Sequence, residues 1–169
     1  MADENTKILT YDNNLERTAR NEMYDLLQDC PIPHEQVLSN LGLFLNSKNL
    51  SRILFMNHIY QKQIDVHGVV MEFGTRWGQN MALFAALRGI YEPFNRHKKL
   101  IAFDTFEGFP EITEEDGSSP MMIEGELALT EDYDQYLSKL VILKVIIHYR
   151  TSKNLNYVKV TLQKQFMNI

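Results

Sequence analysis

Two short apolar runs and a helix-like stripe between them dominate the hydrophobic pattern of the chain. The first run, Val69–Phe73, has a glycine on each side, and the second, Leu100–Phe103, ends at Asp104. A short apolar run between turn residues is typical of a parallel strand that is covered on both faces. Apolar residues then recur at helical spacing over Trp77–Gly89. The pattern predicts a strand–helix–strand unit with parallel strands and a right-handed crossover, which is an α/β fold.

Three more helices are expected before the first strand. The spacing predicts Leu15–Leu27, with Asn14 as its cap, then a short helix over Glu35–Leu45 and a longer one over Ser47–Ile64. The prolines that follow Cys30 end the first helix, because proline lacks a backbone donor and fixes φ. Residues 1–64 would therefore form an N-terminal helical cap beside the sheet.

The chain after the second strand is harder to interpret. A long acidic loop reaches to about Pro120, and Glu131–Leu140 reads as a helix. Loops of this length inside a domain are usually functional. The apolar stretch Val141–Ile147 is a candidate third strand. We therefore expect a partial Rossmann-like core over residues 65–140 and a tail over residues 141–169.

Candidate chemistry gathers at the ends of the two predicted strands. Glu72 and Asp104 stand at the two strand tips, and the first strand runs into Gly-x-x-x-Gly, Gly74 to Gly78. A carboxylate at the second tip is placed to accept the hydroxyls of a ribose, as in dinucleotide folds. Glu72 either anchors the glycine turn or binds a ligand ammonium group, and Asp104 has the alternative role of a helix cap.

The ligand class follows partly from what the loop lacks. The dinucleotide fingerprint Gly-x-Gly-x-x-Gly is absent, and so is the phosphate loop that ends in Gly-Lys-Ser/Thr. A ligand with a ribose but no pyrophosphate fits this loop. S-adenosylmethionine meets that description.

Composition narrows the function classes. The 169 residues carry a net charge of −5 and a sequence pI near 5.5, which argues against a general nucleic-acid binder. No apolar run reaches the length of a membrane span, and the polar start of the chain does not look like a signal peptide. The one cysteine, Cys30, forms no internal disulfide. These features predict a cytoplasmic protein with no membrane or nucleic-acid partner, and they leave homo-oligomer formation open.

The two motifs, GVVMEFGTRWG and LIAFDTFEGFP, resemble those of the macrocin O-methyltransferase family. That family is a class I S-adenosylmethionine-dependent group that methylates sugar hydroxyls on natural products and glycans. The likeness covers roughly residues 20–140. It implies a Rossmann-like class I methyltransferase sheet, incomplete here, and an enzyme that transfers a methyl group to a small-molecule or glycan acceptor. It also implies that the cofactor is bound by Glu72, Gly74, Thr75, Gly78, Asp104, Thr105 and Phe106.

Two expected parts have no counterpart in the sequence. Relatives hold magnesium with a later Asp-rich motif, and no segment here matches it, so no metal ligand and no catalytic base is assigned. The resemblance stops near Leu140, where the charge balance also reverses. Residues 1–140 hold 12 Lys and Arg against 22 Asp and Glu, net −10, and residues 141–169 hold 5 basic residues and no acid, net +5.

A truncated or frame-shifted chain is one hypothesis for this tail. Codons for residues 151–169 can be chosen so that a neighbouring frame reads HIKKFELCKGDATKTIYEY, which is similar to the family's next strand and loop. A sheet cut at this point would expose an open edge and apolar surface, so we expect a marginally stable or aggregation-prone product. The alternatives to a methyltransferase are another Rossmann-like nucleotide-dependent transferase and a non-catalytic remnant.

Overall fold

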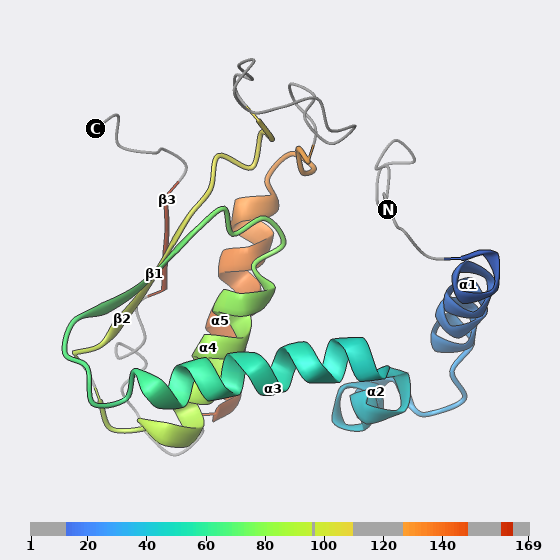
Figure 1. Ribbon diagram of the computed structural model, residues 1–169, viewed down its shortest axis with the longest axis horizontal. Coiled ribbons are helices and arrows are strands. Elements are labelled where there is room, and N and C mark those ends of the chain that lie inside the picture. The colour runs from blue at the N-terminus through green and yellow to red at the C-terminus, as the bar shows by residue number, and fades with distance from the viewer. Residues whose placement is uncertain (1–12, 96, 110–126, 149–159, 164–169) are drawn as a thin grey trace. The chain divides into compact units, whose positions relative to one another are not determined.

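A parallel sheet in the order β1-β2-β3 organises the described chain, which comprises residues 13–95, 97–109, 127–148 and 160–163 of the computed structural model (Figure 1). The elements follow one another as α1 (Asn14–Gln28), α2 (His34–Val37), the 3₁₀ helix η1 (Leu38–Phe44), α3 (Ser47–Lys62), β1 (Val69–Phe73), α4 (Gln79–Tyr91), β2 (Lys99–Phe103), α5 (Tyr133–His148) and β3 (Val160–Gln163).

The predicted strand–helix–strand unit is confirmed. β1 and β2 pair in parallel, from Val69 opposite Lys99 to Phe73 opposite Phe103. α4 connects the two strands and lies alongside α5 (Figure 1). α4 also contacts β2, and α5 contacts β3. The sheet and these two helices form an incomplete Rossmann-like fold, as the apolar runs predicted.

The interpretation of residues 141–147 was wrong. The predicted strand Val141–Ile147 lies inside α5, so the predicted domain boundary at residue 140 falls within a helix. Val141 and Leu137, one helical turn apart, are both buried against Phe106. The next strand is β3, which lies within the predicted tail and pairs in parallel with β2. A continuous apolar run does not distinguish a buried strand from a buried helix, which explains the error.

The helices before the sheet differ from the prediction in detail. Asn13, not Asn14, caps α1: its Oδ1 accepts the Glu16 N–H at 2.9 Å, and Glu16 Oε2 accepts the Asn13 N–H at 3.1 Å. The predicted helix over residues 35–45 is divided into α2 and η1. The chain separates into a unit of Lys7–Leu54 and a unit that contains Phe55–Ile169, so the division falls inside α3. The placement of the helical cap beside the sheet stays a prediction.

The main hydrophobic core joins the end of α3 to α4 and β2. Its buried members lie between these elements: Tyr60, Met81, Phe84, Leu87, Leu100 and Ala102. Each large side chain buried in this way stabilises the fold by about 1.5–3 kcal/mol. In the described part of the chain, no helix has the length and hydrophobicity needed to cross a membrane.

A buried polar cluster closes the core where β2 begins. The Glu92 carboxylate accepts hydrogen bonds from the Tyr60 hydroxyl at 2.7 Å, Asn95 Nδ2 at 2.9 Å and Lys98 Nζ at 3.1 Å. Lys98 Nζ also donates to the Gln63 carbonyl at 2.9 Å. Burial opposes ionisation of Glu92, but these hydrogen bonds outweigh it and hold its pKa below the usual value. The cluster therefore fastens α3, α4 and β2 together through one carboxylate.

One face of β1 carries exposed apolar side chains. Val69, Met71 and Phe73 alternate along the strand and are 44%, 50% and 64% exposed. Among the described strands, β1 pairs on one side only, with β2. An apolar row beside a strand edge of this kind favours self-association.

We expect Met71→Thr to lower the aggregated fraction of the protein, measured by light scattering during a concentration series. Threonine suits a strand, and Met71 is half exposed and is not a member of either buried cluster, so the free energy of unfolding should change by no more than about 0.5 kcal/mol. Phe94→Ser is the matched control, because Phe94 is 91% exposed and lies outside the sheet. Equal reductions in both variants would show that general hydrophobicity, not this face, drives association.

Candidate functional site

A turn of alternating left-handed residues connects β1 to α4. Gly74, Arg76 and Gly78 have φ angles of +70°, +49° and +74°. The Gly74 N–H donates to the Phe103 carbonyl at 3.0 Å, which holds the turn against the end of β2. A Cβ placed on Gly74 would meet nothing within 4 Å, so open space lies beside this backbone. A glycine here lets a ligand approach the main chain closely.

Asp104 fastens this turn to the end of β2. Its Oδ2 accepts the Arg76 N–H at 2.6 Å, and its Oδ1 accepts the Phe106 N–H at 2.7 Å. Hydrogen bonds to an ionised carboxylate are stronger than those between neutral groups. Each carboxylate oxygen retains a further lone pair, so Asp104 can anchor the turn and still accept ligand hydroxyls.

A cavity of about 300 Å³ opens at this point. It is lined by residues of the glycine turn, the loop after β2 and the segment before α5: Gly74, Arg76, Asp104, Thr105, Gly108, Phe109 and Leu127. The structure thus brings together three predicted site residues, Gly74, Asp104 and Thr105. Thr105 Oγ1 donates to the Gly108 carbonyl at 3.2 Å, which shapes the loop that forms one wall.

Three other predicted residues lie outside the lining. Glu72 is half-buried and accepts a hydrogen bond from Asn80 Nδ2 at 2.8 Å, which connects β1 to the first turn of α4. Thr75 is buried, and its Oγ1 has no hydrogen-bond partner among the described residues. Phe106 is buried and packs in the second hydrophobic cluster. Their predicted roles in cofactor binding stay predictions.

Packing against α5 explains why position 78 is a glycine, and the spacing of the motif did not reveal this contact. Gly78 was predicted to lie inside the helix Trp77–Gly89. In the structure it is the N-cap, and α4 begins at Gln79. A Cβ placed there would lie 2.5 and 2.6 Å from the two Cδ atoms of Leu137 in α5. Since real Cβ atoms do not approach so closely, Gly78 allows α4 and α5 to meet.

We expect Gly78→Ala to lower the free energy of unfolding by about 2–4 kcal/mol, from the left-handed φ and from overpacking against Leu137. Gly74→Ala separates the two terms, because its φ is similarly positive and its Cβ would meet open space. Urea unfolding of Gly78→Ala, Leu137→Ala and the double variant measures the coupling. Strictly additive losses would contradict a clash between these two residues.

Several residues that line the cavity were not predicted from the sequence. Gly108 and Phe109 were named only as part of a motif, and Leu127 comes after the segment that was predicted to be an acidic loop. Leu127 has no local signal, because only the folded chain brings it to the strand ends. Arg76 was overlooked although it lies between the two glycines. Its position in a turn at a strand end was the signal that was available.

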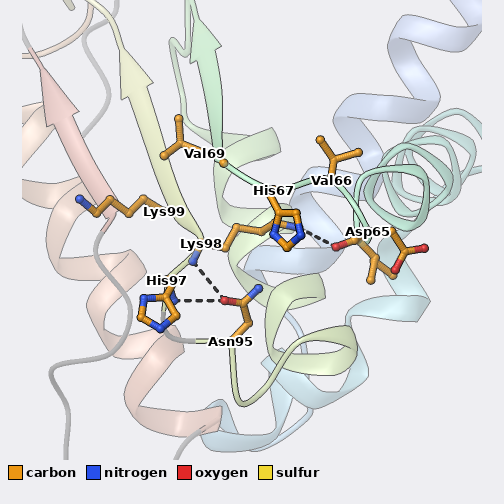
Figure 2. Close-up of a pocket in the computed structure, with 10 residues that line it drawn as sticks. Asp65, Val66, His67, Val69, Asn95, His97, Lys98 and Lys99 are labelled. Atoms are coloured by element: carbon orange, nitrogen blue, oxygen red, sulfur yellow. Dashed lines mark hydrogen bonds between the residues drawn. The ribbon is translucent and has the colours of Figure 1, made fainter.

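A second cavity, of about 520 Å³, lies at the opposite edge of the sheet. Figure 2 shows the residues that line it: Asp65 and His67 come from the loop before β1, and His97, Lys98 and Lys99 come from the segment that begins β2. The side chains of Asp65 and Lys99 point away from one another. Lys98 is already paired with Glu92, and the exposed charges of Lys99 and Asp65 offset one another. This cavity also contains a glycine with open space beside it, Gly68, but no predicted site residue lines it. The smaller cavity contains Gly74, Asp104 and Thr105 and is therefore the candidate site.

Magnesium does not fit the described residues. Among the part of the chain that the structure describes, no group of three or more His, Cys, Asp or Glu side chains is placed to hold a metal ion. S-adenosylmethionine fits better. Its site offers open space beside Gly74 and a carboxylate with free lone pairs, and the volume lies at the lower end of the range for ligand pockets, about 300–1,000 Å³.

The parallel sheet, the glycine turn and the carboxylate at the tip of β2 together define a Rossmann-like fold of the methyltransferase type. Among the solved structures that match the chain, two are of CalS11. One, described as a calicheamicin methyltransferase, has 32% sequence identity and a TM-score of 0.82, and the match covers 95% of this chain and 62% of that one. The other is an apo structure of CalS11, described as a TDP-rhamnose 3′-O-methyltransferase in calicheamicin biosynthesis, at 29% identity and a TM-score of 0.69; the match covers 93% and 59%.

The match covers more of the chain than the sequence motifs do. It includes 95% of this chain, whereas the resemblance to the macrocin O-methyltransferase family covers roughly residues 20–140. The chain spans about 60% of the length of these methyltransferases. No protein-family model matches the sequence, and no curated protein sequence matches it.

Proposed function

We propose that this chain is an S-adenosylmethionine-dependent O-methyltransferase that acts on a sugar hydroxyl of a natural product or glycan. The observation that carries the proposal is the match to CalS11, at 32% identity over 95% of the chain. CalS11 is described as a TDP-rhamnose 3′-O-methyltransferase, so a nucleotide-linked deoxysugar is the first acceptor to test.

The cofactor is proposed to occupy the cavity at the carboxyl ends of β1 and β2. Asp104 accepts the ribose hydroxyls, and Gly74 leaves room for the ligand beside the main chain. Thr105 forms the adjoining wall, and the unpartnered hydroxyl of buried Thr75 lies in the same turn as Gly74. Glu72 supports this arrangement by connecting β1 to α4 through Asn80.

When bound, S-adenosylmethionine supplies an electrophilic methyl group on a sulfonium for in-line displacement by the acceptor oxygen. The described residues contribute positioning: the Asp104 hydrogen bonds fix the turn, and the turn fixes the space beside Gly74. Bringing two reactants together in the correct geometry is a large part of such catalysis. No described residue is assigned as the base that accepts the hydroxyl proton.

The test has two stages. Isothermal titration with S-adenosylmethionine, with Asp104→Ala as the negative control, asks whether the cofactor binds. Transfer of a labelled methyl group to TDP-rhamnose, with and without magnesium, then asks whether the chain is active. Binding without transfer to any sugar acceptor would favour the non-catalytic remnant. Binding of another nucleotide in preference to S-adenosylmethionine would favour a different Rossmann-like transferase.

Membership of the macrocin O-methyltransferase family is part of the proposal. The motifs over residues 68–78 and 100–110 support it. A shifted reading frame near codon 140 also stays a hypothesis. Sequencing of the coding DNA tests it, because an uninterrupted gene whose relatives share residues 141–169 would rule it out.

A further inference from the structure

We propose that Arg76 binds the carboxylate of the methionyl group of S-adenosylmethionine. The inference rests on the proposed function and extends it to the end of the ligand that lies opposite the adenosine. It concerns a residue of the glycine turn to which the sequence motifs assign no role.

Arg76 is held in an unusual position for its residue type. Its φ of +49° lies in the left-handed region, which costs a non-glycine residue about 1 kcal/mol or more. Asp104 keeps it there by accepting its backbone N–H at 2.6 Å. Gly74 and Gly78 adopt similar angles in the same turn without this cost. Glycine would adopt this backbone angle at position 76 without strain. The presence of arginine there therefore suggests that its side chain has a function.

The guanidinium group is fixed but retains capacity for a ligand. Its central carbon lies 5.5 Å from the centroid of the Trp77 ring, which orients its plane. Its Nε is buried and has no hydrogen-bond partner among the described residues. Among the described residues, no carboxylate forms a salt bridge with Arg76. A buried donor without a partner is costly and indicates a group that a ligand satisfies.

The cavity gives this donor a specific complement. Arg76 and Asp104 both line it and carry opposite charges. S-adenosylmethionine has hydroxyls on its ribose for Asp104 and an anionic carboxylate at its other end. Arginine binds carboxylates through two parallel N–H donors, which gives both strength and orientation. Seating the two ends of the ligand on Asp104 and Arg76 would fix the sulfonium between them.

The experiment compares two ligands that differ in the carboxylate alone. Isothermal titration measures the Kd of S-adenosylmethionine and of its decarboxylated form for the wild-type protein, Arg76→Met and Arg76→Lys. A charged hydrogen bond is worth about 10–100-fold in affinity, so the wild-type protein should prefer S-adenosylmethionine by that factor. Arg76→Met should lose this preference while its Kd for the decarboxylated form stays unchanged. Arg76→Lys should keep part of the preference.

The outcomes separate this inference from the proposed function. If neither ligand binds the wild-type protein, the cofactor assignment fails. If S-adenosylmethionine binds but the wild-type protein does not distinguish the two ligands, the role of Arg76 is overturned while the cofactor assignment stands, and that comparison requires no variant to fold. A loss in Arg76→Met that is equal for both ligands would make Arg76 a purely structural residue.

Discussion

Asp104→Ala is expected to weaken S-adenosylmethionine binding by about 100-fold or more, because two charge-assisted hydrogen bonds to the ribose would be lost. The same substitution also removes the acceptor for the Arg76 and Phe106 N–H groups. The glycine turn should then loosen, and the midpoint of thermal unfolding should fall with the affinity. Isothermal titration and a thermal melt of the same preparation measure the two effects.

Two further variants separate binding from turn stability. Asp104→Asn retains one oxygen acceptor of nearly the same shape, so it should recover part of the thermal stability but little of the affinity, since the charge is gone. Glu107→Gln is the matched control, because Glu107 is an exposed acid three positions along the same loop. Wild-type affinity in Asp104→Ala would contradict the assignment of this carboxylate to the ribose.

The parts of the site that could be predicted are those set by local sequence. Both apolar runs became strands almost residue for residue, because a short run between turn residues leaves few alternatives. The position of Asp104 at the cavity follows from these two strands, because parallel strands present their carboxyl ends at one edge of the sheet. Gly74 followed directly, since a turn must begin where β1 ends.

The parts that could not be predicted depend on tertiary contact. Gly78 matched a ligand-loop spacing, but its contact with Leu137 comes from a helix far along the chain. Leu127 lines the cavity together with Gly108 and Phe109, and no local pattern in the sequence predicts that it lies there. Residues 141–147 were assigned to a strand because an apolar run has no period, and only burial against Phe106 selects the helix. In each case a contact distant in sequence decided the structure.

Glu92→Gln is expected to lower the free energy of unfolding by about 3–5 kcal/mol, because it leaves the buried charge of Lys98 with backbone carbonyl acceptors but no opposite charge. The side chains of Lys98 and Glu92 are 4% and 6% exposed and lie 3.1 Å apart. Small domains are stable by only about 5–15 kcal/mol in total, so this is a large fraction. Urea unfolding near neutral pH measures it. Glu107→Gln, the exposed control, should change stability by less than about 0.5 kcal/mol.

The pH dependence of stability gives an independent check on the same cluster. The pKa of Glu92 is held below its ordinary value of 4.5, so its contribution is fully present above about pH 4.5 and is lost as the pH falls through the folded-state pKa. Burial and the hydrogen bond to Glu92 raise the pKa of Tyr60 above 10.0, so that contribution is present below about pH 10 and is lost at higher pH. Glu92→Gln should therefore flatten the acid limb of the curve. The double variant Glu92→Gln with Lys98→Met removes both charges and should recover much of the lost stability. A double variant no more stable than Glu92→Gln, together with an unchanged acid limb, would mean that the hydrogen bonds from Tyr60 and Asn95, and not the ion pair, hold α3, α4 and β2 together.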